Sequence, residues 1–195
     1  MRKIISQMMI SLDGFIEGLN QELNWHHVDD EYHKYTEEML YSVDAILYGR
    51  KTYQHMKNFW PTEFAIEKFP AIAERMNNLP KIVFSSTLND VDWNDTTLIK
   101  EKVNDYLMEL KQQPGKDLVI LGSSDFVSFL TNINLVDEYQ VIVNPVILGG
   151  GKPYFKNITD CKLLKLVRAK VFKSGNVLLC YQIARVTPQT KTDSK

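Results

Sequence analysis

Residues 45–52 read AILYGRKT, a short apolar run that ends at Gly49 and leads into a helical pattern. A short apolar run followed by small or hydroxyl residues also occurs in residues 81–87 (KIVFSST) and in residues 118–125 (LVILGSSD). Apolar runs of this length, stopped by small residues, are typical of buried strands. Because such strands alternate with amphipathic helices along the chain, the sequence predicts an α/β fold with a mainly parallel sheet.

The rest of the chain continues this alternation. Strands are predicted at Ile4–Ile10, Ala45–Tyr48, Lys81–Phe84, Leu118–Leu121, Glu138–Val143, Leu163–Phe172 and Val177–Ile183, and helices at Asp29–Val43, Pro70–Asn78, Glu101–Lys111 and Ser123–Leu130. A tight turn at Lys173–Asn176 makes the last two strands an antiparallel hairpin, so the sheet is mixed. We expect one domain over residues 1–185 and a disordered tail over residues 186–195, which has almost nothing to bury.

Composition and charge exclude several classes of protein. The 195 residues include 23 Lys and Arg against 24 Asp and Glu, so no broad basic surface for nucleic acid is expected. No apolar stretch approaches the ~20 residues of a membrane span. The two cysteines, Cys161 and Cys180, and the four histidines lack zinc-ligand spacing, so no metal site is predicted. With no disulfide pattern and no signal peptide, we expect a cytoplasmic protein.

Three turns that follow central strands carry the candidate binding residues, namely Gly49–Thr52, Ser85-Ser86 and Gly122–Ser124. The carboxyl ends of parallel strands meet at one edge of the sheet, where open α/β folds bind ligands. Free N–H groups at a helix start favour an anion, and Arg50 adds a permanent charge suited to phosphate. The turns therefore predict a nucleotide site. The alternative is that their glycines and serines only end strands and cap helices.

Other motifs are less specific. The run Gly149–Lys152 lacks the spacing of a Walker A loop, which favours a sharp turn or close packing, while its lysine pointing at an anion stays open. Asp13 is either an ordinary turn residue or a functional residue at the mouth of the first strand. The aromatic residues Trp25, Phe59 and Trp60 line either a pocket for a flat heterocycle or a subunit contact.

Seven stretches occur in an order that resembles a known family: Ser11–Gly14 (SLDG), Tyr48–Tyr53 (YGRKTY), Phe59–Pro61 (FWP), Lys81–Ser86 (KIVFSS), Leu121–Ser123 (LGS), Leu135–Tyr139 (LVDEY) and Pro145–Lys152 (PVILGGGK). Together they resemble the dihydrofolate reductase-like superfamily. The branch that they resemble most is the stand-alone relatives of the C-terminal reductase domain of the bifunctional riboflavin biosynthesis deaminase/reductase. The resemblance covers residues 1–184 and implies a three-layer α/β/α domain that binds NADPH along the carboxyl edge of the sheet.

The resemblance also implies roles for individual positions. In that family a Gly-Arg-x-Thr turn and a Ser-Ser turn hold the phosphates of the adenosine half, and a glycine-rich turn cradles the pyrophosphate. The implied cofactor-binding residues are Gly49, Arg50, Thr52, Ser85, Ser86, Gly122, Ser123 and Ser124. Arg50 and Ser86 are expected near the 2′-phosphate, and Asp13 is the candidate catalytic residue.

Two departures from the family pattern bear on the substrate. Riboflavin-pathway reductases commonly follow Ser-Leu-Asp-Gly with a lysine, where this chain has Phe15, so a cation for a phosphoribosyl group is missing. True dihydrofolate reductases place a buried carboxylate in the helix after a Trp. Here Trp25 is followed by the acids Asp29–Glu31 at loose spacing, and these acids equally well cap the helix.

The expected function is an NADPH-dependent reductase of a small heterocycle, resembling 5-amino-6-(5-phosphoribosylamino)uracil reductase. The alternatives are a dihydrofolate reductase and a nucleotide-binding protein without turnover. We also expect a homodimer, because the family often pairs and because Phe59–Pro61 and the late strands offer apolar surface.

Overall fold

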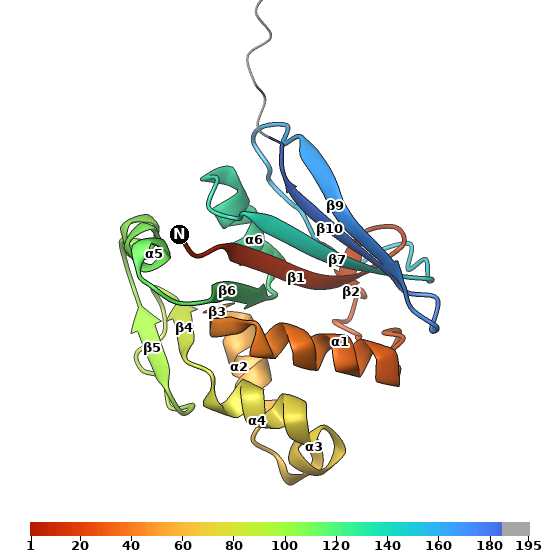
Figure 1. Cartoon of the computed structure of the whole chain (residues 1–195), viewed down its shortest axis with the longest axis horizontal. Helices are drawn as coiled ribbons and strands as arrows, with labels where there is room; N and C mark the ends of the chain where they lie inside the picture. The colour runs from red at the N-terminus through yellow and green to blue at the C-terminus, as the bar shows by residue number, and fades with distance from the viewer. Residues whose placement is uncertain (185–195) are drawn as a thin grey trace, which may run out of the picture.

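The computed structural model describes residues 1–184 (Figure 1). Its strands are β1 (Ile4–Ser11), β2 (Phe15–Glu17), β3 (Val43–Gly49), β4 (Lys81–Phe84), β5 (Thr96–Ile99), β6 (Asp117–Leu121), β7 (Glu138–Asn144), β8 (Lys152–Pro153), β9 (Leu164–Val171) and β10 (Val177–Ile183). Its helices are α1 (Asp30–Tyr41), α2 (Arg50–Phe59), α3 (Glu63–Lys68), α4 (Pro70–Asn78), α5 (Val103–Gln112) and α6 (Ser124–Asn132). The tail predicted over residues 186–195 lies outside the described residues.

Eight strands form one sheet in the order β5-β4-β3-β6-β1-β7-β10-β9, and β2 pairs with β8 in a separate two-stranded sheet. The six strands from β5 to β7 are parallel, while β10 runs antiparallel to both β7 and β9. The predicted mixed, mainly parallel sheet with an antiparallel C-terminal hairpin is therefore confirmed.

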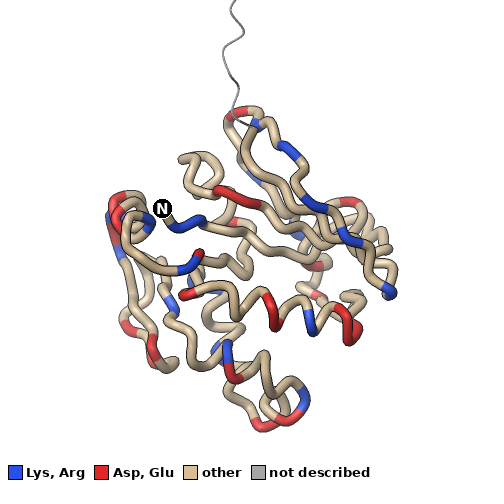
Figure 2. Tube along the Cα trace, viewed as in Figure 1, with Lys and Arg blue, Asp and Glu red and all other residues tan. Residues whose placement is uncertain are grey.

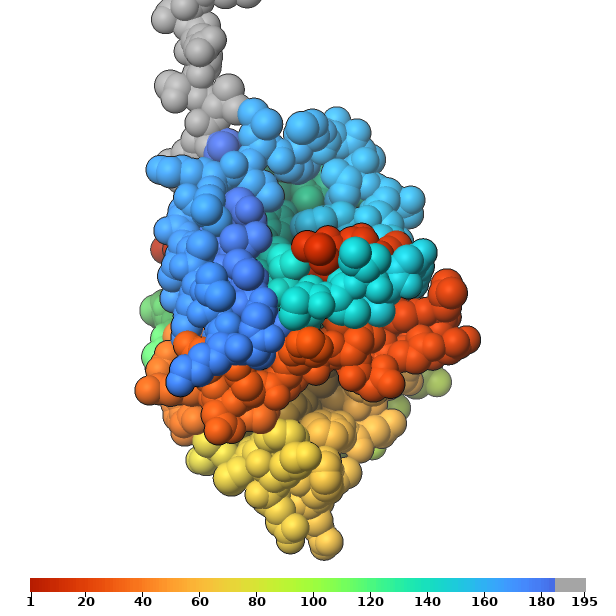
Figure 3. Space-filling model, turned by 90° about the vertical axis from the view of Figure 1, so that its right-hand side faces the viewer, coloured from red at the N-terminus to blue at the C-terminus, as the bar shows by residue number. Residues whose placement is uncertain are grey.

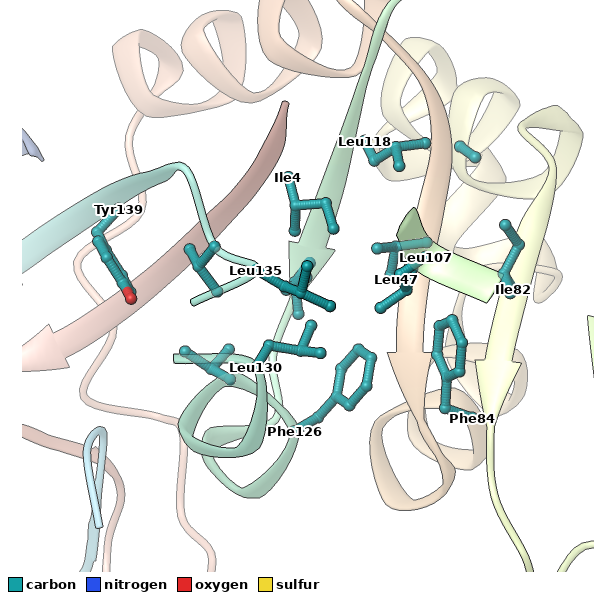
Figure 4. Close-up of a cluster of buried hydrophobic side chains, with 14 of the residues drawn as sticks. Ile4, Leu47, Ile82, Phe84, Leu107, Leu118, Phe126, Leu130, Leu135 and Tyr139 are labelled. Atoms are coloured by element: carbon teal, nitrogen blue, oxygen red, sulfur yellow. The ribbon is translucent and has the colours of Figure 1, made fainter. Parts of the chain in front are cut away.

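Helices cover both faces of this sheet, which gives the predicted three layers (Figure 1). On one face α5 and α6 contribute Leu107, Phe126 and Leu130 to a buried cluster with the inward side chains of the central strands (Figure 4). On the other face α1, α2 and α4 bury residues such as Leu40 and Tyr53 against β3 and β4. The two apolar layers hold the parallel strands in register and thereby align their carboxyl ends.

Local signals explain the element boundaries. Helix α4 spans Pro70–Asn78, as predicted, because Pro70 occupies its first turn. Helix α1 starts one residue later than predicted, since the Asp29 side chain accepts the Tyr32 N–H and caps the helix. It ends at Tyr41, and Val43 already belongs to β3, so the predicted end at Val43 is wrong.

Other sequence-based expectations need correction. The elements β2, β5, β8 and α3 were not predicted, because each has six residues or fewer and little periodicity. In α1 the buried residues are Tyr35, Met39 and Leu40. Cys161 and Cys180 are both free, the first exposed before β9 and the second buried in β10. Within residues 1–184, no helix is long and apolar enough to cross a membrane.

Candidate functional site

The three turns that the sequence singled out lie around one cavity. Strands β3, β4 and β6 are neighbours in the parallel part of the sheet, so their carboxyl ends share an edge. The cavity measures about 430 Å³ and is lined by Gly49, Arg50, Lys51, Phe84, Ser85, Ser86, Lys100, Val103, Ser123, Asp125, Phe126 and Phe129. Thr52, Gly122 and Ser124 do not line it. The predicted turns are thus brought together at the carboxyl edge.

Two glycines allow the turns to approach each other. A Cβ at Gly49 would lie 3.3 Å from the Ser123 Oγ, which is closer than an ordinary van der Waals contact. Gly122 has a φ of +78°, in the left-handed region that favours glycine. A Cβ added there would lie 3.5 Å from the Thr52 side chain, an ordinary van der Waals contact. Thr52 therefore packs behind the third turn.

Two helix starts at this edge have no side-chain cap. Gly49 caps α2 and Ser123 caps α6, and in the described chain neither cap makes a side-chain hydrogen bond to its helix. The first N–H groups of both helices are then available to an anion, and each helix presents the positive end of its dipole. The buried Ser124 hydroxyl also lacks a partner among residues 1–184. Such orphaned donors are typical of a site that a ligand completes.

The charges around the cavity favour an anion. Arg50, Lys51 and Lys100 line it and form no ion pair with any carboxylate in residues 1–184. The one acid on the wall, Asp125, pairs with Lys156 and lies 3.5 Å from Lys152. Burial raises the pKa of Asp125, but the two lysines outweigh it and hold that pKa below its ordinary value. The net field at the cavity is therefore positive.

An aromatic pair forms the apolar wall of the cavity. Phe84 and Phe126 stack with ring centroids 5.0 Å apart and an interplanar angle of 23° (Figure 4). Val103 and the exposed ring of Phe129 extend this wall. A positive pocket with a flat apolar wall can take a ligand that joins phosphates to an aromatic base.

Within the run Gly149–Lys152, the residue that requires close packing is Gly151. Gly151 has a φ of +141°, and a Cβ there would overlap the Glu17 carbonyl oxygen. The next residue, Lys152, lies between Glu17 and Asp125, at 3.9 Å and 3.5 Å. Lys152 thus neutralises a carboxylate on the cavity wall instead of lining the cavity.

Asp13 lies outside the cavity. Its carboxylate accepts the backbone N–H groups of Leu148 at 3.2 Å and Gly149 at 2.7 Å. A hydrogen bond with the Ser11 side chain is the main cause that lowers the pKa of this exposed carboxyl. In the structure Asp13 ties the loop after β7 to the end of β1, and its catalytic role stays a prediction.

The aromatic residues of the loops also lie elsewhere. Trp60 packs against the apolar cluster that α1, α2 and α4 form on β3 and β4, and it contacts Phe69. Phe59 contacts Phe64 at the α2–α3 corner. Trp25 stacks edge-on against His26 in the loop that precedes α1. Neither Trp25 nor Trp60 lines the 430 Å³ cavity, so the heterocycle pocket that they were expected to line is not this one.

The structure has a cluster of buried polar side chains between β1 and α1 that the sequence analysis did not predict. Gln7 pairs with Leu121, one residue before Gly122, and its side-chain Nε2 is buried without a partner in the described chain. The Thr36 hydroxyl is equally unpartnered, and Tyr32 lies beside both side chains. An amide in the middle of a buried strand is the signal that could have indicated this group, because a buried amide needs partners.

The loop before α1 is held by hydrogen bonds to the end of β7 and to the turn of the C-terminal hairpin. The Asn144 side chain accepts the His27 N–H at 2.9 Å, and Asp29 accepts the Ser174 N–H at 2.9 Å. His26, which precedes both residues in this loop, has a buried Nε2 without a partner among residues 1–184, and burial lowers the pKa of His26 to about 4.

Stability is expected to depend on pH through His26. In the folded protein His26 stays neutral down to about pH 4, whereas in the unfolded chain it takes a proton below about pH 6.5. Unfolding therefore takes up a proton in this window, and stability falls as the pH drops from 6.5 to 4. Urea unfolding at four pH values should give a shallower fall for His26→Phe than for wild type. His55→Phe, on the exposed side of α2, should keep the wild-type slope, and equal slopes for all three would contradict the assignment.

Comparisons with known proteins agree with this architecture. The family model described as the RibD C-terminal domain matches residues 2–179. The uncharacterized protein YyaP of Bacillus subtilis is 34% identical over 180 residues, which cover 92% of this chain and 94% of YyaP. A putative riboflavin biosynthesis protein from Shewanella sp. PV-4 superposes with a TM-score of 0.73 at 22% identity, over 94% of this chain and 99% of that one.

A dihydrofolate reductase from Enterococcus faecalis, solved with NADP(H), superposes with a TM-score of 0.64 at 17% identity. The alignment covers 94% of this chain and 97% of the reductase. At such identities the structural matches establish a shared fold, which is the dihydrofolate reductase-like one.

Proposed function

The chain belongs to the RibD C-terminal domain family, and we propose that it is an NADPH-dependent reductase of a small heterocyclic compound. The observation that carries the proposal is the cavity at the carboxyl edge. Three cations without a carboxylate partner among residues 1–184 meet there with two helix starts that no described side chain caps. Phosphates linked to an aromatic base match this combination of positive charge and flat apolar wall.

The residues present fit a dinucleotide with an additional phosphate. The N–H groups at the start of α6, with Ser123 and Ser124, would bind the pyrophosphate. Arg50, Ser85 and Ser86 would bind the 2′-phosphate, since a guanidinium and hydroxyls suit that group. Ser123 supports this fit, because it lines the cavity and its side chain makes no capping hydrogen bond in the described chain.

The nicotinamide of such a cofactor supplies a hydride, so the protein needs no nucleophile of its own. The chain has to exclude water and to orient the acceptor. We assign the orientation of the heterocycle to Gln7 of β1, which pairs with Leu121 beside Gly122, and to Thr36 and Tyr32 of α1. The Gln7 Nε2 and the Thr36 hydroxyl are buried without a partner among residues 1–184. A heterocycle with donors and acceptors on one edge would supply these partners.

Among residues 1–184, the contacts of Asp29 and Glu31 do not favour the dihydrofolate reductase alternative. Asp29 accepts the N–H groups of Tyr32 and Ser174, and Glu31 pairs with Lys170 at 2.9 Å. Both carboxylates are thus engaged in fixing α1 to the C-terminal hairpin. Phe15, at the position where a lysine is common, pairs with Pro153 in the two-stranded sheet. We therefore propose a substrate without a phosphoribosyl group.

The proposal is tested by measuring NADPH oxidation with purified protein against a panel of acceptors. The panel holds the ribosylaminopyrimidine intermediate with and without its phosphate, dihydrofolate, and simple carbonyl compounds. Oxidation with the unphosphorylated pyrimidine or with a related heterocycle supports the proposal. Oxidation with dihydrofolate alone would assign the dihydrofolate reductase function instead. Tight NADPH binding without oxidation of any acceptor would indicate a nucleotide-binding protein without turnover.

A further inference from the structure

An acidic side chain lies where the proposed function needs an anion to bind. Asp125 is in the first turn of α6, lines the cavity, and has 47% of its side chain exposed. The first N–H groups of the same helix are those assigned to the pyrophosphate, and Ser123 does not cap them through its side chain. A carboxylate stabilises such a helix start but repels a second anion there. Asp125 therefore competes with the phosphates unless its charge is balanced.

Two lysines balance this charge, and both come from the segment that begins at β8. Lys156 pairs with one carboxylate oxygen of Asp125, and the Lys152 Nζ lies 3.5 Å from the other. The same ammonium group lies 3.9 Å from the carboxylate of Glu17, the residue of β2 that pairs with Lys152 in the two-stranded sheet. Glu17, Lys152, Asp125 and Lys156 thus form a row of alternating charges, which we call the ion-pair row.

The fold holds Lys152 in this row. Its side chain is only 19% exposed, so solvent and salt screen its charge less than that of a surface lysine. Strand β8 is fixed on β2 by the close approach of Gly151 to the Glu17 carbonyl oxygen. Figure 3 shows the segment after β8, in light blue, beside the β1–β2 segment, in red. The position of the ammonium group therefore depends on the two-stranded sheet as well as on the ion pair.

The field at the start of α6 depends on these nearest charges. Basic and acidic residues are interspersed along the trace (Figure 2), so distant charges largely cancel. We infer that Lys152 and Lys156 are positioning residues for the cofactor, because they neutralise Asp125 and thereby allow the start of α6 to accept the pyrophosphate. The inference rests on the proposed function. Neither lysine lines the cavity, so both act through Asp125.

This role differs from that of Arg50 in its effect on the two cofactors. NADPH and NADH share the pyrophosphate, whereas only NADPH has the 2′-phosphate. Loss of either lysine should therefore weaken both cofactors equally. An unbalanced carboxylate beside a pyrophosphate should cost about tenfold in affinity.

The experiment removes the charge of each lysine and keeps its aliphatic stem. Lys152→Met and Lys156→Met should each bind NADPH and NADH about tenfold more weakly than wild type in a fluorescence titration. Lys162→Met is the matched control, because Lys162 lies in the same segment but contacts Asn134 and does not line the cavity. Its affinities should equal those of wild type. Unchanged affinities in both lysine variants, or a loss for NADPH alone, would overturn the inference.

A second substitution separates charge balance from a merely structural role of the lysines. Asp125→Asn removes the charge that the lysines balance, so Lys152→Met combined with Asp125→Asn should recover the wild-type affinity for both cofactors. Asp125→Asn alone should bind both at least as tightly as wild type. A double variant as weak as Lys152→Met would contradict charge balance. A tenfold loss in Asp125→Asn alone would mean that Asp125 itself contacts the cofactor, which would also overturn the inference.

A titration of the Asp125 carboxyl carbon by NMR reads the ion-pair row without any activity measurement. Burial raises the pKa of Asp125, but the two lysines hold it below its ordinary value. That pKa should rise in Lys152→Met, and it should also rise in wild type when NADP⁺ is bound, because a nearby anion disfavours the ionised form. An unchanged pKa in both cases would overturn the inference. A wild-type chain that binds neither cofactor would overturn the proposed function together with it, whereas wild-type binding that both lysine variants retain would overturn this inference alone.

Discussion

Replacement of Arg50 by alanine is expected to weaken NADPH binding by about ten- to a hundredfold and to leave NADH binding almost unchanged. Arg50 lines the cavity beside Ser85 and Ser86 and has no carboxylate partner among residues 1–184. Only NADPH carries the 2′-phosphate proposed to lie there. A hydrogen bond between a charged donor and a phosphate contributes roughly 1.5–3 kcal/mol, which corresponds to that loss of affinity.

Fluorescence titration of both cofactors measures this effect directly. Lys57→Ala is the matched control, because Lys57 lies on the same helix but pairs with Asp92 outside the cavity. Its cofactor affinities should equal those of wild type. Equal losses for NADPH and NADH in Arg50→Ala would place Arg50 on the pyrophosphate and remove the reason for an NADPH preference. No loss for either cofactor would mean that this cavity is not the nucleotide site.

Gly151→Ala is expected to lower the free energy of unfolding by about 2–4 kcal/mol. At this residue φ is +141°, and an added Cβ would overlap the Glu17 carbonyl oxygen and lie 3.2 Å from the Gly18 Cα. These are backbone atoms, so the strain can be relieved only if β2 and β8 move apart. The midpoint of thermal unfolding should fall by roughly 5–15 °C.

Gly149→Ala is the control that separates the steric overlap of an added Cβ from the conformational strain of a positive φ. Gly149 also has a positive φ, +72°, but no heavy atom lies within 4 Å of the Cβ that an alanine would add. Its substitution should cost only about 1 kcal/mol, the strain of a left-handed alanine. Similar midpoints for the two variants would show that the approach of Gly151 to Glu17 does not limit stability.

The elements that the sequence predicted well are those with strong local signals. Helix α4 has the predicted bounds because Pro70 starts it, and β4 and β10 are apolar runs with clear ends. The missed strands lack such signals. Strand β5 is the edge strand of the sheet and reads TTLI with no fully buried residue, and β2 with β8 involves only a few residues whose pairing depends on Gly151.

The residues of the candidate site also fall into those that local sequence signals predicted and those that they could not predict. Glycines and hydroxyl residues after apolar runs indicate turns at the ends of strands. Because the strands are parallel, these turns were expected to lie together, as Gly49, Ser85 and Ser123 do around the cavity. Lys100 could not be predicted, because it follows the edge strand β5, which local pattern did not reveal. The ion pair of Asp125 with Lys156 could not be predicted either, because it joins α6 to the segment after β8 and no local sequence pattern indicates that these segments are in contact.

The place of β1 in the sheet has a consequence for biosynthesis. It is synthesised long before its two neighbours in the sheet, β6 and β7, at Asp117–Leu121 and Glu138–Asn144. Its apolar residues Ile4–Ile10 must stay unpaired on both sides while more than half of the chain is still being made. Pairs so distant in sequence form slowly, and an exposed apolar strand is prone to associate with other chains. A nascent chain arrested before Asp117 should therefore depend on chaperones, and one released after Asn144 should not.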